Sequence, residues 1–276
     1  MTRQPAAGVG TTRLGALEVT RLIIGGNPFS GFSHQSRERS AAMRAWYTDE
    51  RIVETWFQAE ALGLTACLCR GDAHIVGALE RYWRAGGTLR WIAQTDSAKG
   101  LVDGARYCLE HGAAACYLHG GRVDYYVAHQ EYGQIEAFVR TVADAGVPVG
   151  IAGHVPADFI WAEAHLDLDF YMVSYYNPSP RDHDPQYDPE TVEQYLESDR
   201  AERVALIQKL RRPAIHYKVL AAGRTAPADG LRYAAQHMRP EDAVCVGVYT
   251  QDNADMLAED VTLFRQAWQR RADRGI

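Results

Sequence analysis

The chain has 276 residues, of which 47% are hydrophobic and 23% are charged. These proportions are ordinary for a soluble globular protein, and about 250 residues is the typical length of a single (β/α)8 barrel. The formal net charge of −6 argues against a nucleic-acid-binding protein, which needs a basic patch, and against binding to anionic membranes. We therefore expect a small-molecule substrate as the partner, and the sequence leaves a homo-oligomer open.

The cysteines predict the cellular compartment of the protein, and the N-terminal residues predict where its folded domain begins. The chain has an odd number of cysteines, and apolar runs that resemble strands contain four of them, so we predict buried free thiols in a reducing compartment. No apolar run approaches the roughly 20 residues that a membrane span needs. Residues 1–10 lack the apolar core of a signal peptide, and we expect them to form a flexible N-terminus. The predictions are thus a cytoplasmic protein and one barrel domain over residues 11–276.

A short apolar strand followed by an amphipathic helix recurs eight times along the chain. The predicted strands cover residues 19–25, 64–69, 89–94, 114–118, 148–152, 170–174, 214–220 and 243–248. The predicted helices cover residues 49–62, 75–84, 98–111, 132–145, 157–164, 199–210, 229–237 and 252–271. Strands that are apolar on both faces indicate a buried parallel sheet, and eight units in this length favour a closed barrel over an open sheet. The long connections 26–47 and 175–198 follow strand C-termini, where we expect lids or substrate walls.

Five segments, in chain order, resemble the aldo/keto reductase family: residues 12–26, 116–119, 173–178, 215–223 and 246–255. They are similar to that family's opening hairpin and first strand, its histidine-bearing fourth strand, its sixth and seventh strands, and its final cofactor-binding segment. The resemblance implies an α/β fold, a single (β/α)8 TIM barrel with an N-terminal β-hairpin. The resemblance covers nearly the whole chain. Each segment alone is moderately specific, and the main support for the resemblance is that all five occur in the family's order.

The same resemblance places the family's catalytic tetrad on this sequence incompletely. The family uses an aspartate, a tyrosine, a lysine and a histidine, with the tyrosine as the proton donor to a carbonyl. Here Leu68 stands at the aspartate position, no tyrosine follows at the expected spacing, and the strand that ends near Asp96 lacks the lysine. Only His119 matches. The resemblance therefore implies the barrel without the standard carbonyl reduction.

Polar side chains at the strand ends converge over the mouth of a barrel. His119 and His154 end neighbouring strands, and with Asp96 or Asp72 they would form a two-histidine, one-carboxylate set for a divalent metal. The alternative, favoured by the lack of H-x-H or H-x-x-x-H spacing, is that both histidines are hydrogen-bonding pocket residues without a metal. We interpret His34 as a solvated loop histidine rather than a further ligand. The candidates for substrate binding are Asn27, Gln94, Asp96, Tyr176, Asn177 and Arg224.

Lys218 stands out because a lysine in an apolar strand is seldom buried without a partner. His216 and Lys218 are two residues apart, so we expect them on the same face of one strand. Lys218 could anchor a carboxylate or phosphate, form a Schiff base or act as a base, and the alternative is an ion pair with Asp72 or Asp96. Asp72 is either a catalytic carboxylate or the N-cap of the following helix.

A phosphate site is a further interpretation of the last third of the chain. Arg224 and the segment 250–253, at a predicted helix start, would supply a guanidinium and backbone N–H groups for phosphate oxygens. The alternative is an ordinary capped helix.

These residues support three hypotheses. The first is a non-redox acid–base enzyme of lyase or isomerase type, metal-assisted or metal-free, acting on a small polar oxygenated substrate. Its catalytic residues would be His119, His154, Lys218 and Asp72. The second is an NADP-dependent oxidoreductase with a relocated proton donor, such as His119 or a loop tyrosine. The third is a non-catalytic small-molecule-binding barrel. Among cofactors, we expect a divalent metal before NADP.

Overall fold

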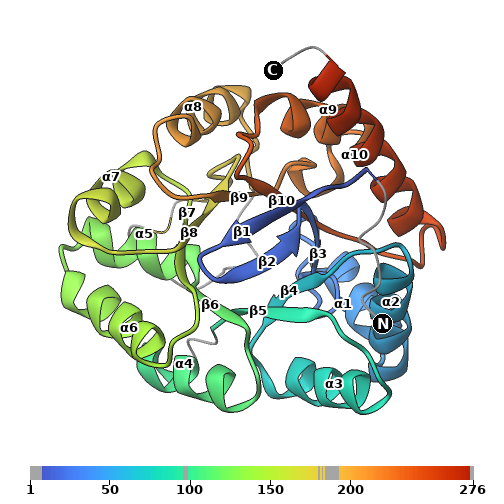
Figure 1. Cartoon of the computed structure of the whole chain (residues 1–276), viewed down its shortest axis with the longest axis horizontal. Coiled ribbons are helices and arrows are strands. Elements are labelled where there is room, and N and C mark those ends of the chain that lie inside the picture. Colours follow the sequence, from blue (N-terminus) through green and yellow to red (C-terminus); the bar gives the residue numbers. More distant parts are fainter. Residues whose placement is uncertain (1–7, 96–98, 180, 182, 184–192, 274–276) are drawn as a thin grey trace.

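A closed barrel of eight parallel strands forms the centre of the protein, and helices surround it (Figure 1). The computed structural model describes residues 8–95, 99–179, 181, 183 and 193–273. Around the barrel the strand order is β10-β3-β4-β5-β6-β7-β8-β9, so consecutive strands are neighbours and β10 closes onto β3. The barrel strands are β3 (Leu22–Gly25), β4 (Ala66–Arg70), β5 (Arg90–Gln94), β6 (Ala115–Leu118), β7 (Val149–Gly153), β8 (Phe170–Ser174), β9 (Ala214–Tyr217) and β10 (Ala243–Gly247). The predicted fold class is confirmed.

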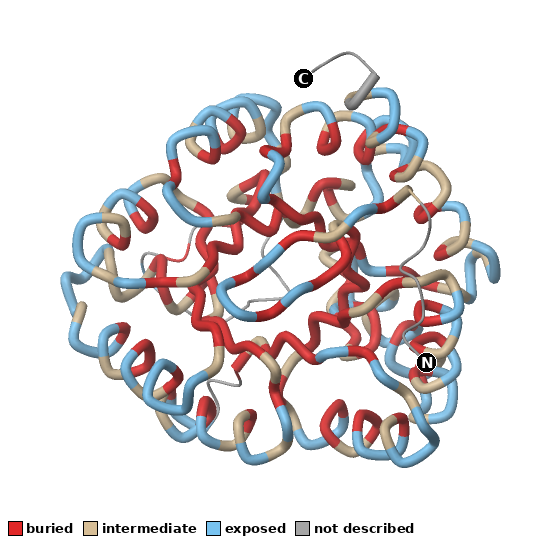
Figure 2. The backbone as a smooth tube through the Cα atoms, in the orientation of Figure 1, coloured by how far each residue is buried: buried red, intermediate tan, exposed pale blue. Residues whose placement is uncertain are grey.

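The helices form the outer layer, with their apolar faces against the strands. Figure 2 shows the strands buried and the outward sides of the helices exposed. Polar residues define several helix starts: the side chain of Thr48 caps α2, and that of Asp72 caps α3. The helices are α1 (Arg37–Trp46), α2 (Asp49–Ala61), α3 (Ala73–Arg84), α4 (Leu101–Glu110), α5 (Gly120–Ala128), α6 (Tyr132–Asp144), α7 (Pro156–His165), α8 (Glu197–Ile207), α9 (Pro227–His237) and α10 (Met256–Asp273).

An antiparallel hairpin covers the end of the barrel at which the strands begin. It consists of β1 (Thr11–Leu14) and β2 (Leu17–Thr20), and Figure 1 shows it lying across the barrel axis. Its two-residue turn begins at Gly15, whose positive φ of 57° suits glycine. Leu14, Leu17 and Val19 pack into the same apolar cluster as the inward-facing strand residues. This end of the barrel is therefore closed by hydrophobic packing.

The structure differs from the sequence predictions mainly in two extra helices. The connection 26–47 contains α1, and α5 begins directly after His119, where Gly120 and Gly121 interrupt the hydrophobic pattern. The seventh barrel strand, predicted to reach residue 220, ends at Tyr217. Part of the long connection 175–198 and residues 1–7 lie outside the described residues.

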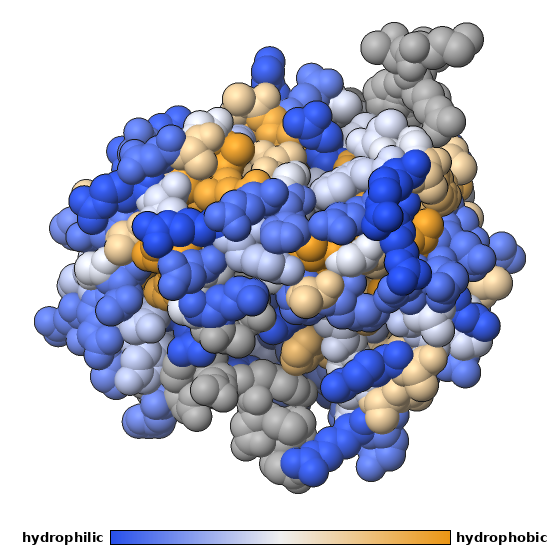
Figure 3. Space-filling view, turned by 90° about the horizontal axis from the view of Figure 1, so that it is seen from below, coloured by the Kyte–Doolittle hydropathy of each residue, from blue (hydrophilic) through white to orange (hydrophobic). Residues whose placement is uncertain are grey.

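The structure agrees with the prediction that the cysteines are buried free thiols. All five cysteines are buried and free. In the described part of the chain, no helix has the length and apolar character required to span a membrane. The face seen in Figure 3 is mostly hydrophilic, with hydrophobic side chains confined to small areas.

His216 does not share a face with Lys218, contrary to the sequence prediction. Its side chain is fully buried outside the barrel interior, where Nδ1 lies 2.9 Å from the Tyr175 hydroxyl and Nε2 lies 3.2 Å from Asp242 Oδ2. Asp242 also accepts hydrogen bonds from the backbone N–H groups of Ala214 (2.8 Å) and Arg239 (2.7 Å). Burial would raise the pKa of Asp242, but the hydrogen bonds and charges of His216 and Arg239 lower it to about 2. This network joins the starts of β9 and β10.

Replacing Asp242 by alanine should destabilise the fold strongly, because it leaves buried Arg239 and His216 without their anion. The expected loss in the free energy of unfolding is about 3–5 kcal/mol. Urea titration followed by circular dichroism measures it. Glu241→Ala is the matched control, since this neighbouring side chain is 46% exposed, and it should cost less than about 1 kcal/mol. Equal losses in the two variants would contradict the structural role of Asp242.

Candidate active site

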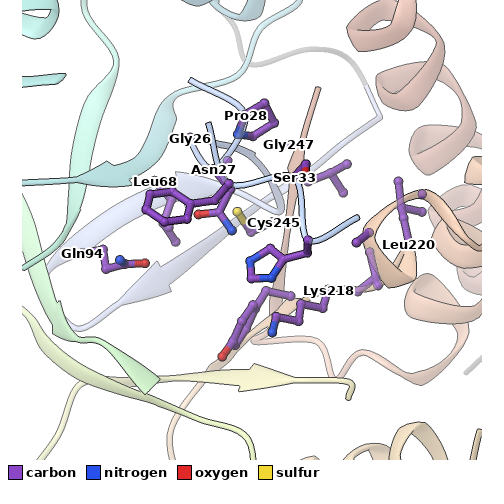
Figure 4. A pocket seen from close by; sticks show the side chains of 18 of the residues that line it. Gly26, Asn27, Pro28, Ser33, Leu68, Gln94, Lys218, Leu220, Cys245 and Gly247 are labelled. Atoms are coloured by element: carbon purple, nitrogen blue, oxygen red, sulfur yellow. The ribbon is translucent and has the colours of Figure 1, made fainter. Parts of the chain in front are cut away.

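The open end of the barrel, where the strands end, holds a cavity of about 800 Å³. That volume suits a small organic ligand. Its floor includes inward-facing strand residues such as Leu68, Met172 and Cys245, and its walls come from the loops that follow the strands. Figure 4 shows Gln94 and Lys218 extending into the cavity from opposite sides. Polar and charged side chains thus lie above an apolar cavity floor.

A buried histidine–aspartate pair lies at one side of the cavity. His154 follows β7, and Asp124 lies on α5; their side chains are 9% and 5% exposed. His154 Nδ1 is 2.7 Å from Asp124 Oδ2, and the His154 backbone N–H donates to Asp124 Oδ1 at 3.0 Å. A carboxylate can only accept here, so Nδ1 carries the proton and Nε2 keeps its lone pair. The pair fixes both the tautomer and the direction of the ring.

The charge states of this pair follow from burial and mutual attraction. Burial lowers the pKa of His154, and the nearby Lys218 acts in the same direction, while Asp124 opposes both. Burial would raise the pKa of Asp124, but the charge and hydrogen bonds of His154 keep it below its ordinary value. His154 is therefore a neutral base held by an ionised carboxylate.

Two further groups converge on the free nitrogen of His154. The Tyr217 hydroxyl lies 3.1 Å from Nε2, and Lys218 Nζ lies 3.4 Å from it. Burial and then the charge of Asp124 raise the pKa of Tyr217 well above its ordinary value, so the phenol keeps its proton. Burial lowers the pKa of Lys218 to about 8. A base, a phenol and an amine that titrates near neutrality thus meet at one point.

Gly120 is the reason these groups can come so close. A Cβ atom at this position would lie 2.8 Å from His154 Cε1 and 3.2 Å from the Tyr217 hydroxyl. Any larger residue would therefore push the first turn of α5 away from the base. Arg203 holds the other side by donating from Nε to the His154 carbonyl oxygen at 2.8 Å.

Cationic groups dominate this side of the cavity. Arg70, Arg122 and Arg181 line it together with Lys218. Burial lowers the pKa of His119 to about 3, and the charges of His154, Arg70 and Arg181 act in the same direction. His119 is therefore a neutral hydrogen-bonding ring, and the local potential favours an anionic ligand.

A buried histidine–glutamate contact borders the cavity near Lys218, and burial lowers the pKa of His34 below its ordinary value. His34 Nδ1 lies 2.7 Å from Glu193 Oε1, and the Tyr195 hydroxyl donates to Glu193 Oε2 at 2.7 Å. The interpretation of His34 as a solvated loop residue is wrong. Arg224 donates to the His34 carbonyl oxygen at 3.0 Å and stacks over the Tyr195 ring at 4.3 Å. Arg224 thus fastens two loops together.

Comparison with known proteins gives likenesses in structure only. No protein-family model and no curated protein matches this sequence. A protein provisionally assigned as an aldo-keto reductase, from Pseudomonas aeruginosa, superposes with a TM-score of 0.63 and 16% identity, covering 96% of this chain and 98% of its own. An aldo-keto reductase solved with NADPH gives a TM-score of 0.56 at 12% identity, covering 95% of this chain and 87% of its own. This chain shares the aldo/keto reductase fold.

A second enzyme class has the same barrel. A truncated 3-deoxy-D-arabino-heptulosonate 7-phosphate synthase from Thermotoga maritima superposes with a TM-score of 0.53 at 15% identity, covering 96% of this chain and 91% of its own. At such identities the likeness establishes the fold, and the reaction must be inferred from the site.

The structure brings only some of the sequence-predicted residues to the cavity. Those that line it are Asn27, Gln94, His119, His154 and Lys218. Asp72 instead accepts from the Ile75 N–H at 2.9 Å as the cap of α3, with Arg70 Nε 3.4 Å away, so it follows the capping alternative and does not pair with Lys218. Asp96 lies outside the described residues.

Three predicted substrate-binding residues have other surroundings. Tyr176 is 1% exposed and packs edge-on against Tyr195. The Asn177 N–H donates to Asp199 Oδ2 at 3.0 Å. Neither Tyr176 nor Asn177 is among the described residues that line the cavity. Arg224 is tied to the His34 loop, and Asp252, in the segment proposed for phosphate, pairs with Arg39. The predicted phosphate site is therefore not supported.

The metal hypothesis gains no support from the described residues. Within them, no group of three or more histidine, cysteine, aspartate or glutamate side chains is arranged to hold a metal ion. His154 uses Nδ1 for Asp124 and points Nε2 at an amine and a phenol. A metal at Nε2 would have to compete with Lys218.

Sequence reasoning missed Asp124, Tyr217 and Asp260. Asp124 was hidden because α5 was not recognised, and Tyr217 because it belongs to an apolar strand. Asp260, on α10, is 2% exposed and lines the cavity, yet no described side chain or backbone group donates a hydrogen bond to it. Burial, and then the charge of Glu259, raise its pKa to about 7.

Asp260 should make stability depend on pH. Its pKa rises from an ordinary 3.8 to about 7 on folding, so its protonated form is stabilised, and stability is lost as the pH rises from about 4 to 7. An asparagine side chain at this position would mimic the neutral acid, so Asp260→Asn should melt higher than the wild type at pH 8, by more than at pH 5. Thermal unfolding at both pH values measures the difference.

Asp144→Asn provides the matched control, because Asp144 is exposed at the end of α6. Its effect on the melting temperature should be the same at both pH values. A pH-independent effect of Asp260→Asn would contradict a pKa near 7 for this buried carboxyl group.

Proposed function

We propose that this protein is a non-redox acid–base enzyme, of lyase or isomerase type, that acts on a small anionic carbonyl compound. One observation carries the proposal: Asp124 holds His154 as a neutral base whose Nε2 faces Tyr217 and Lys218 inside the cavity. Bases fixed by a buried carboxylate beside proton donors are characteristic of acid–base catalysis.

Each group has a defined part in such a reaction. His154 Nε2 removes a proton from the carbon beside the substrate carbonyl, and Asp124 stabilises the imidazolium that forms. Tyr217, which stays protonated, donates to the carbonyl oxygen as negative charge develops there. His119, neutral at physiological pH, is a second donor to that oxygen. Asp72 has no part, because it caps α3.

The charge of the cavity supports an anionic substrate. Arg70, Arg122, Arg181 and Lys218 line it, and guanidinium groups bind carboxylate and phosphate oxygens in a fork geometry. The described lining around His154 is rich in cations, so an anionic compound matches its potential better than a neutral sugar does.

An NADP-dependent oxidoreductase is the second candidate. It is favoured because lining residues between 245 and 256 overlap the segment 246–255, which is similar to the cofactor-binding segment of aldo/keto reductases, and the cavity also reaches the loop after the seventh barrel strand. Tyr217 would then be the relocated proton donor. Against it, Arg224 is occupied by the His34 loop, and Asp252 and Asp260 lie where phosphates would have to bind.

Proton exchange in D₂O tests the proposal directly. We expect the wild-type protein to catalyse exchange of the protons beside the carbonyl of pyruvate, hydroxypyruvate or dihydroxyacetone phosphate, at a rate above that in buffer alone. Proton NMR measures the exchange as loss of the signals of these protons. His154→Gln should lower the rate by about 100-fold or more, because removing a general base costs that much. His129→Gln, an exposed histidine at the far end of α5, should not change it.

Titration with NADPH, followed by tryptophan fluorescence, separates the two candidates. The acid–base proposal expects no saturable response. Saturable NADPH binding together with no exchange of any of the three compounds would contradict the proposal and favour the oxidoreductase.

A further inference from the structure

Lys218 is one of only three lysines among the 29 lysine and arginine residues of the chain. The other two, Lys99 and Lys209, are exposed, and Lys99 stacks over the ring of Tyr107. Lys218 alone of the three lines the cavity. The other basic side chains of the described lining are arginines, whose planar fork suits carboxylate and phosphate oxygens better than an amine does, so an amine at this position calls for a separate explanation.

A left-handed backbone conformation at residue 218 places this amine in the cavity. Alternation along β9 directs His216 outward and Tyr217 toward the cavity, so a continued strand would direct residue 218 outward. Instead the strand ends, and Lys218 adopts φ = 57°, a left-handed conformation that costs a non-glycine residue energy. Figure 4 shows the result, with the Lys218 side chain extended into the cavity.

The surroundings of the amine suit a nucleophile. Its Nζ lies 3.4 Å from His154 Nε2, a base that can take a proton from it. Burial lowers the pKa of Lys218 to about 8; Glu193 and Asp124 oppose this shift, and Arg181 adds to it. About half of the amine is therefore uncharged at pH 8, compared with well under 1% for an ordinary lysine.

We propose that Lys218 attacks the carbonyl carbon of the substrate and forms an imine with it. This inference rests on the proposed function, since it takes the same anionic carbonyl compound, and it adds that the substrate must be an aldehyde or ketone that is open to attack. The observations that carry it are the turned backbone, the approach of Nζ to the His154 base and the place of Lys218 in the cavity.

The step is balanced without any redox partner. The amine nitrogen forms a bond to the carbonyl carbon while His154 Nε2 accepts a proton from the nitrogen. The former carbonyl oxygen takes one proton from the Tyr217 hydroxyl as the carbinolamine forms and a second from the His154 imidazolium as it departs as water. Tyr217 then regains a proton from solvent, which is the one net proton that formation of the protonated imine consumes, and His154 is again neutral. The resulting protonated imine withdraws electrons from the neighbouring bond, which lowers the barrier to breaking a C–H or C–C bond there.

Chemical trapping at the three lysines tests the inference. The wild-type protein is incubated at pH 8 with pyruvate and sodium cyanoborohydride, and separately with pentane-2,4-dione, which forms a stable enaminone with uncharged amines. Peptide mass mapping then gives the modification rate at each lysine. We expect Lys218 to react about tenfold or more faster than Lys99 and Lys209, because burial lowers the pKa of Lys218 and the His154 base lies beside its amine. Equal or slower modification of Lys218 would overturn the proposal.

Lys218→Arg distinguishes an imine from a mere anchor. Arginine keeps the positive charge but cannot form an imine, so this variant should lose both the trapping and the D₂O exchange of pyruvate. Lys209→Arg should keep both. Exchange that persists in Lys218→Arg would overturn the imine while leaving the acid–base function intact. Trapping at Lys218 without exchange of any compound would uphold a nucleophilic lysine and contradict the proposed acid–base function.

Discussion

The hydrogen bond between Asp124 and His154 is the contact on which the rest of the site depends. It decides which ring nitrogen carries the proton, so it decides that the free lone pair faces the cavity. The second oxygen of Asp124 binds the backbone N–H of the same histidine, which fixes the ring and the chain together. In a buried environment this pairing is stronger than in water, and an unpaired carboxylate there would be costly. The same contact holds α5 against His154. Because the first turn of α5 is then so close to the ring, residue 120 has no room for a side chain.

The two ends of the barrel divide stability from chemistry. At the end where the strands begin, the hairpin fills the barrel with Leu14, Leu17 and Val19, and Asp242 ties β9 to β10. At the other end, the strand ends and the loops that follow them enclose a cavity, and polar groups there contact one another, as Asp124, His154 and Tyr217 do. The closed end supplies the rigidity that a site with fixed distances needs.

The sequence was sufficient for the barrel because eight apolar strands and their helices repeat a pattern that local physics enforces. It was sufficient to place His119, His154 and Lys218 at the cavity, because the two histidines follow recognisable strands and Lys218 interrupts an apolar strand pattern. It could not supply Asp124, since two glycines at 120 and 121 resemble a helix stop, whereas here they begin α5 close to His154. It also placed His216 with Lys218, because a strand pattern contains no sign of a left-handed residue that reverses the alternation. The capping role of Asp72 was one of two alternatives, which only the contact with Ile75 could separate.

Several unfavourable features meet at Lys218, and this coincidence argues for a chemical role. A left-handed lysine is strained, removal of an amine from water opposes its charge, and Arg181 and Arg70 line the same cavity. A lysine in solvent avoids the removal from water and the nearby arginines, and Lys99 and Lys209 are exposed in this way. An anchoring residue would gain from keeping its full charge, yet this environment reduces that charge. An amine that must lose its proton to react benefits from each of these features, because strain fixes its direction, burial frees its lone pair and His154 receives the proton.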